Sequence, residues 1–158
     1  MRDMYAGELM TPDPITITPD TPIAEAAREF RIHDIGFLPV VDSDRNLQLV
    51  GVITDRDIAC RCVAEGHDPT KCSVESHMTR DVAAANPGDH VNRVMELMQG
   101  AQVRRIPVVS DTGRLLGVIA QADLAVEAVE EDAVSPLDVA YTLERISLPA
   151  HPQRKGAH

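Results

Sequence analysis

Two stretches of the chain place apolar residues along one face of a helix. In both, these residues stand at positions i, i+3, i+4 and i+7, the spacing of an amphipathic helix. They are Ile23, Ala26, Ala27 and Phe30 in the first stretch, and Val91, Val94, Met95 and Met98 in the second. Thr21 is a good N-cap and proline is favoured at the first helical position, so the first helix is expected to begin at Pro22. The second stretch lies behind Asp89 in the same way.

Each helical stretch is followed by two short runs rich in β-branched residues, with a polar turn between them. The runs cover residues 35–41 and 49–54 after the first helix, and 103–109 and 115–120 after the second. Because the turns are short, each pair of runs is expected to form antiparallel strands. A further helix is expected after each pair, beginning near Arg56 and near Ala122, and Gly66 is a natural residue to end the first of these.

The second half of the chain repeats the first. The matching residues, at a shift of 68 that becomes 66 after a two-residue deletion, are Met10 and Met78, Asp13 and Asp81, Pro39 and Pro107, Gly51 and Gly117, and Asp57 and Asp123. Each copy reads as an extended piece, helix, strand, strand and helix, which is too small to be stable alone and needs the other copy as its partner surface. The predicted fold class is therefore α/β (α+β), built from two such units.

The repeat divides the chain into four parts. Residues 1–67 form the first unit with an N-terminal lead-in, 68–77 a polar connector, 78–134 the second unit, and 135–158 a short helix followed by a tail expected to be disordered.

Composition excludes several classes of protein. The net charge of −10 with only two Phe, two Tyr and no Trp is unsuited to nucleic-acid binding, because such a chain repels phosphates and lacks stacking surfaces. No uncharged apolar run approaches the length of a membrane span, and Asp3 and Glu8 interrupt the opening segment, so no membrane association and no signal peptide are expected. The expected location is cytoplasmic, where cysteines remain reduced.

No catalytic motif is present in the sequence. There is no glycine-rich phosphate loop, no G-x-S-x-G and no H-E-x-x-H, so the chain is expected to bind a ligand rather than to act as an enzyme, with no cofactor.

Thiols and imidazoles gather around the connector, and these groups suit zinc. They are Cys60, Cys62, Cys72, His67 and His77. Two observations argue against a metal site. The two sulfurs of a C-x-C on a helix point in different directions, and the chain has no C-x-x-C pair. The alternative is packed thiols with solvated histidines. No metal is assigned, and the question stays open.

The junction Gly51–Asp57 is the strongest candidate for ligand binding. A strand is expected to end at Thr54, and the amides that open the next helix would face an anion. The Thr54 hydroxyl suits a phosphate, and the Asp57 carboxylate suits the hydroxyls of a ribose. The alternative is a capping box, since T-x-x-D places each side chain near the other residue's N–H. The second copy keeps Asp123 but has Ala120 in place of the threonine, which weighs toward binding, although dipole compensation could also explain Asp123.

The residues in paired arrangement resemble a tandem CBS-domain pair, the Bateman module. They read MT, IGFLPVVD and GVITDRD in the first copy, and MT, VRRIPVV and GVIAQAD in the second. The resemblance covers Glu8 to about Val134, and the first unit is similar to small stand-alone bacterial CBS-pair proteins. It implies two β-α-β-β-α units about a pseudo-twofold axis, often assembled as homodimers, with clefts that bind AMP, ADP, ATP or S-adenosylmethionine.

The resemblance also implies two sets of ligand-binding residues. They are Thr16, Ile17, Phe37, Leu38, Pro39, Thr54 and Asp57 in the first site, and Arg104, Arg105, Ile106, Pro107 and Asp123 in the second. In the first site Thr54 would meet phosphate or ribose and Asp57 ribose, while the backbone near Thr16 and Ile17, with Phe37, Leu38 and Pro39, would line the base. Ile106 and Pro107 would flank the base in the second site. In the second, the arginines would meet phosphate and Asp123 ribose; Ala120 departs from the family's Ser or Thr.

The expected function is a non-catalytic regulatory module that binds an adenosine-containing ligand and reports it to an unidentified regulated protein through a conformational or oligomeric change. The alternative is an interaction scaffold with vestigial clefts, working through its dimer surface or the segment 137–143.

Overall fold

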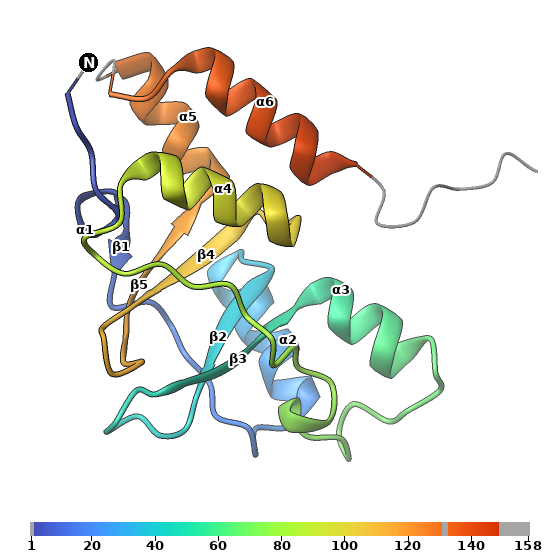
Figure 1. Cartoon of the computed structure of the whole chain (residues 1–158). Helices are drawn as coiled ribbons and strands as arrows, with labels where there is room; N and C mark the ends of the chain where they lie inside the picture. Colours follow the sequence, from blue (N-terminus) through green and yellow to red (C-terminus); the bar gives the residue numbers. More distant parts are fainter. Residues whose placement is uncertain (1, 131–132, 149–158) are drawn as a thin grey trace, which may run out of the picture. The chain divides into compact units, whose positions relative to one another are not determined.

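The computed structural model describes residues 2–130 and 133–148, which form a mixture of helices and short strands (Figure 1). In chain order the elements are α1 Ala6–Leu9, β1 Thr11–Pro12, α2 Ile23–His33, β2 Phe37–Val41, β3 Leu49–Thr54, α3 Asp55–Asp57, the π-helix η1 Ile58–Val63, the 3-10 helix η2 Val74–Ser76, α4 Val91–Ala101, β4 Arg105–Val109, β5 Leu115–Ala120, α5 Gln121–Glu130 and α6 Pro136–Ser147. The predicted α+β class is confirmed. The expected disordered tail, 149–158, lies outside the described residues.

The strands pair as the turn lengths predict. β2 and β3 form an antiparallel two-stranded sheet in which Phe37 lies opposite Thr54 and Leu38 opposite Ile53. β1, β5 and β4 form a second sheet in that order. β2 and β4 begin two residues later than the apolar runs indicate.

The predicted N-cap of the first helix, Thr21, is wrong by one residue. α2 begins at Ile23 with Pro22 as its N-cap, because the Thr21 hydroxyl accepts from the Thr18 N–H at 3.3 Å and so closes the turn before the helix. Before α4, the Asp89 carboxylate likewise accepts from a residue behind it, the Asn86 N–H, at 2.8 Å. His90 is the cap there, and its Nδ1 accepts from the Asn92 N–H. Short polar side chains close turns as readily as they cap helices.

The chain forms two compact units that do not follow the order of the repeat. One contains the residues up to Met10, Ala83–Val108 and the described residues from Val118 onward; the other contains Thr11–Val82 and Val109–Gly117. We call them unit 1 and unit 2. The division by repeat placed the N-terminal lead-in with the first copy, whereas the structure groups it with the helix α4 of the second.

Backbone hydrogen bonds hold the lead-in in unit 1. The Ala6 N–H donates to the Asp89 carbonyl at 2.8 Å, and the Gly7 N–H to the Pro87 carbonyl at 2.9 Å. Gly7 is suited to this close approach, because a Cβ there would lie 3.2 Å from the Pro87 Cβ. In unit 2 the connector is held similarly, since the Val74 N–H donates to the Thr21 carbonyl at 2.8 Å.

Each unit has its own hydrophobic core. In unit 2, Ile23 and Ala26 of α2 are fully buried, Phe30 packs at the edge of the core, and Ala27 is exposed. In unit 1 all four predicted core residues of α4 are buried. No helix within 2–130 or 133–148 has the length and apolar character to cross a bilayer.

Candidate functional site

The β3–α3 junction forms the reciprocal capping box that T-x-x-D allows. The Thr54 hydroxyl accepts from the Asp57 N–H at 3.1 Å, and the Asp57 carboxylate accepts from the Thr54 N–H at 3.0 Å. The structural role considered for these two residues is therefore present. It does not exhaust either side chain, because the hydroxyl keeps its proton and the carboxylate keeps further lone pairs.

The amides that open this helix are not free to hold an anion. The Asp55 N–H donates to the Gly36 carbonyl at 3.0 Å and the Arg56 N–H to the Asp55 carboxylate at 2.8 Å, while those of Thr54 and Asp57 serve the capping box. The expectation of an anion site made by free backbone amides is corrected accordingly. A ligand at this junction would have to contact side chains.

Asp123 has the same structural task in the second copy. Its carboxylate accepts from the Ala120 N–H at 2.7 Å, which is the half of the capping box that does not need a hydroxyl at position 120. The retention of Asp123 beside Ala120 therefore has a structural reason, and by itself it does not favour ligand binding.

The structure brings the predicted first-site residues together within unit 2. The Ile17 N–H donates to the Pro39 carbonyl at 3.2 Å, so the segment at Thr16 and Ile17 runs beside β2, and Phe37 of β2 lies opposite Thr54. Thr16 and Phe37 are half-buried.

Three residues of the predicted base-lining set are so buried that their side chains have little surface with which to contact a ligand. Ile17 and Leu38 belong to the core of unit 2, Leu38 with no exposed surface, and Pro39 is also buried. Their backbone, rather than their side chains, is what this site could present.

The second set of predicted residues has an equivalent arrangement within unit 1. The Ala85 N–H donates to the Pro107 carbonyl at 2.9 Å, as the Ile17 N–H does to Pro39 in the first copy. Ile106 and Pro107 are buried, Ile106 in the core. Arg104 lies just before β4 and is exposed, whereas Arg105, the first residue of the strand, is half-buried.

Arg61 is a residue of this region that the sequence analysis did not single out. Its Nη1 donates to the carbonyls of His77 and Met78 at 3.2 and 3.3 Å, and its Nε lies 3.7 Å from the Asp57 carboxylate. The Asp57 side chain is 13% exposed, so Arg61 supplies positive charge beside a largely enclosed carboxylate. The i,i+4 spacing of an acid and an arginine was the available signal.

Thiols and an imidazole meet where the connector returns to η1. The ligand atoms of Cys62, Cys72 and His77 all lie within 4.8 Å of one another. Burial raises the pKa of the Cys62 thiol, and Cys72 adds to this effect. Burial also lowers the pKa of His77, and electrostatic interactions with His67 and Arg61 add to this effect. The objection that C-x-C separates its sulfurs holds for Cys60, which is exposed.

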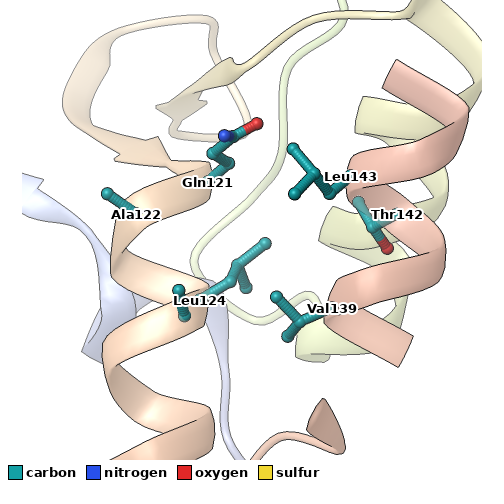
Figure 2. Close-up of a pocket in the computed structure, with 7 residues that line it drawn as sticks. Gln121, Ala122, Leu124, Val139, Thr142 and Leu143 are labelled. Atoms are coloured by element: carbon teal, nitrogen blue, oxygen red, sulfur yellow. The ribbon is translucent and has the colours of Figure 1, made fainter. Parts of the chain in front are cut away.

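A small apolar pocket lies between α5 and α6 in unit 1, where side chains of the two helices face one another (Figure 2). Its lining residues are Gln121, Ala122, Leu124, Ala125, Val139, Thr142 and Leu143. Its volume of ≈ 80 Å³ is well below the roughly 300–1,000 Å³ of ligand pockets. Thr142 within it is satisfied, accepting from Gln99 at 2.9 Å and donating to the Asp138 carbonyl. This pocket is a packing gap beside α6 rather than a nucleotide site.

Comparison with known proteins identifies the family. The CBS domain family matches residues 6–62 and 74–130. The CBS domain-containing protein YhcV of Bacillus subtilis is 35% identical over 126 residues, which cover 80% of this chain and 86% of YhcV.

Two solved structures are similar over most of their length. Hypoxic Response Protein I with two coordinated zinc ions is 30% identical, with a TM-score of 0.70 over 77% of this chain and 97% of that one. The CBS domain pair of protein MJ0100 in complex with 5'-methylthioadenosine and S-adenosyl-L-methionine is 31% identical, with a TM-score of 0.69 over 78% and 94%. The chain therefore belongs to the CBS domain family and carries two copies of that domain.

Proposed function

We propose that the chain is a non-catalytic regulatory module that binds an adenosine-containing ligand at the β3–α3 junction of unit 2. The observation that carries the proposal is the half-buried Phe37 lying opposite Thr54, whose hydroxyl is hydrogen-bonded to the residue with the enclosed carboxylate, Asp57. Support comes from the structure of the MJ0100 CBS pair, whose ligands 5'-methylthioadenosine and S-adenosyl-L-methionine both contain adenosine.

The side chains at the junction have complementary tasks in this proposal. The Asp57 carboxylate accepts from the ribose hydroxyls with the lone pairs that the capping box leaves, and the aromatic face of Phe37 packs on the base. Thr54 donates its hydroxyl proton to a ribose or phosphate oxygen. In the second copy Arg104, Arg105 and Asp123 form the corresponding proposed set, without a hydroxyl at Ala120.

The ligand would act by stabilising one arrangement of the module over another. A ligand shifts such a balance only by its difference in affinity for the two arrangements, and the change would be passed to a regulated protein.

Ligand affinity at this junction should depend little on phosphate. A held phosphate adds charge-assisted hydrogen bonds worth about 1.5–3 kcal/mol each, a factor of about 10 to 150, but the amides that would supply them are already engaged. Calorimetric titration with adenosine, AMP, ATP and S-adenosylmethionine should therefore give adenosine a Kd within about tenfold of that of AMP. Heat from the phosphorylated ligands alone would refute this and move recognition to Arg104 and Arg105.

An interaction surface on α5 and α6 is the second candidate function, and we propose a second copy of this chain as its partner. The two helices pack side by side in unit 1 (Figure 1) and leave large apolar side chains uncovered, with Val129 84% and Leu137 77% exposed. Large exposed apolar patches are typical of protein interfaces.

Leu137→Glu should convert such a dimer to a monomer, because it places a charge in the apolar contact. Light scattering after size-exclusion chromatography measures the mass. Val63→Glu is the matched control, since Val63 is 61% exposed but lies in unit 2. A wild-type monomer, or equal loss of the dimer in both variants, would count against this surface.

A further inference from the structure

Three soft donor groups from separate segments of unit 2 converge on one point. Cys62 lies on η1, Cys72 lies in the connector and His77 follows η2, yet their ligand atoms are all within 4.8 Å of one another. Cys72 follows Cys62 by ten positions and His77 follows Cys72 by five, so the folding of the connector onto η1 creates the cluster.

The cluster contains a polar atom that the protein leaves unsatisfied. His77 is 5% exposed, and its buried Nε2 has no hydrogen-bond partner among the described residues. A buried polar group without a partner costs about 1–3 kcal/mol, so it calls for an explanation. Cys62 is fully buried beside it, and its thiol makes a long contact of 3.7 Å to the His67 carbonyl and also interacts with Cys72.

We propose that Cys62, Cys72 and His77 bind a zinc-type divalent metal ion. Two thiolates and one imidazole are a donor set that suits zinc, whereas Ca²⁺ and Mg²⁺ prefer oxygen ligands. At a Zn–S distance of about 2.3 Å, tetrahedral geometry places two sulfurs about 3.8 Å apart. The donor atoms therefore need to close by about 1.3 Å at most, which side-chain rotation can provide.

His67 is the fourth ligand in this proposal. Its ring centroid lies 5.3 Å from that of His77, and it is exposed and so able to turn toward the cluster. With four protein ligands the site would be closed and structural rather than catalytic. The metal would fasten the connector to η1, the helical segment that continues from the Thr54–Asp57 junction, alongside the hydrogen bonds from Arg61 to His77 and Met78.

The site is tested on the full chain, made without an affinity tag, reduced, and dialysed against chelated buffer. Titration with Co²⁺ should give thiolate-to-metal charge-transfer bands and the strong visible bands of tetrahedral cobalt at one ion per chain. Competition with a chromophoric chelator then gives the Zn²⁺ affinity. Cys72→Ser and His77→Gln should weaken zinc binding by more than about 100-fold, since loss of an outer-shell group alone costs about 10–100-fold.

Cys60→Ser is the matched control, because Cys60 is exposed and two residues from Cys62. It should keep the cobalt spectrum and the wild-type affinity, and His67→Ala should change the spectrum while retaining cysteine charge transfer. Cys72 is only half-buried, so its serine variant should fold, which circular dichroism checks. Zn²⁺ should raise the Tm of the wild type and not that of Cys72→Ser.

Three results would overturn the proposal. One is a wild-type chain that takes up no Co²⁺ with thiolate bands. Another is equal loss of binding in Cys60→Ser and Cys72→Ser. The third is a chain that binds no metal ion but forms a disulfide between Cys62 and Cys72 under mild oxidation, which would make the two cysteines a redox pair. Adenosine binding is measured separately, so none of these outcomes depends on the proposed function.

Discussion

Leu38→Ala should lower the free energy of unfolding by about 2–5 kcal/mol, the usual cost of removing a fully buried leucine side chain. Leu38 has no exposed surface and packs in the core of unit 2 among residues such as Ile23 and Ile53. The family resemblance implies that it lines a ligand, whereas its burial makes it a core residue first. Urea denaturation of the variant and the wild type at the same pH measures the difference.

Phe37→Ala is the matched variant at the neighbouring position. Phe37 is half-buried and lies opposite Thr54, so its loss should cost less stability than that of Leu38 but should weaken adenosine binding. The contrary pattern, with a stable Leu38→Ala that fails to bind ligand and a Phe37→Ala that binds normally, would make Leu38 the ligand contact.

The repeated elements were predictable because they depend on local periodicity and turn length. The antiparallel pair β2–β3 and the core-facing residues of α4 follow from apolar spacing alone. The two copies even repeat individual hydrogen bonds: the Asp55 N–H donates to the Gly36 carbonyl at 3.0 Å, and the Gln121 N–H to that of Arg104 at 2.9 Å. A repeat in the sequence thus carried over into repeated backbone contacts.

The grouping of the lead-in was not predictable in the same way. Ala6 is fully buried in the core of unit 1 with residues of the second copy, although it precedes the first copy in the chain. The apolar spacing of such a short segment is compatible with either of two similar cores. Only tertiary contacts, such as the hydrogen bond from the Ala6 N–H to the Asp89 carbonyl, decide between them.

The junction and the thiol cluster show the two ways in which site prediction was limited. At Thr54 and Asp57 one motif serves both a helix cap and a ligand, and spacing alone does not separate the two uses. At Cys62, Cys72 and His77 the donors come from segments whose approach depends on the path of the connector, so no compact ligand motif marks them in the sequence.

Asp57→Asn should weaken adenosine binding by about 10- to 150-fold while leaving the fold intact. The asparagine keeps a carbonyl oxygen that can accept from the Thr54 N–H, so the helix cap survives. It loses the charge and part of the acceptor capacity that the ribose hydroxyls would use, and hydrogen bonds to a charged group are worth about 1.5–3 kcal/mol. Asp57→Ala is a less useful variant, because it removes the cap together with the carboxylate.

Asp123→Asn is the matched control. Asp123 holds the same half of a capping box in the second copy, with an oxygen 2.7 Å from the Ala120 nitrogen, so the two substitutions make the same chemical change in equivalent surroundings. If loss of such a carboxylate disturbed the fold or its stability, both variants would show that effect.

Calorimetric titration of the wild type, Asp57→Asn and Asp123→Asn with AMP and S-adenosylmethionine tests the central claim most directly. The account predicts that Asp57→Asn weakens binding at the β3–α3 junction by about 10- to 150-fold and that Asp123→Asn keeps the wild-type Kd there. A variant at Asp57 that binds as tightly as the wild type would contradict the account, because it would remove the ligand from the β3–α3 junction.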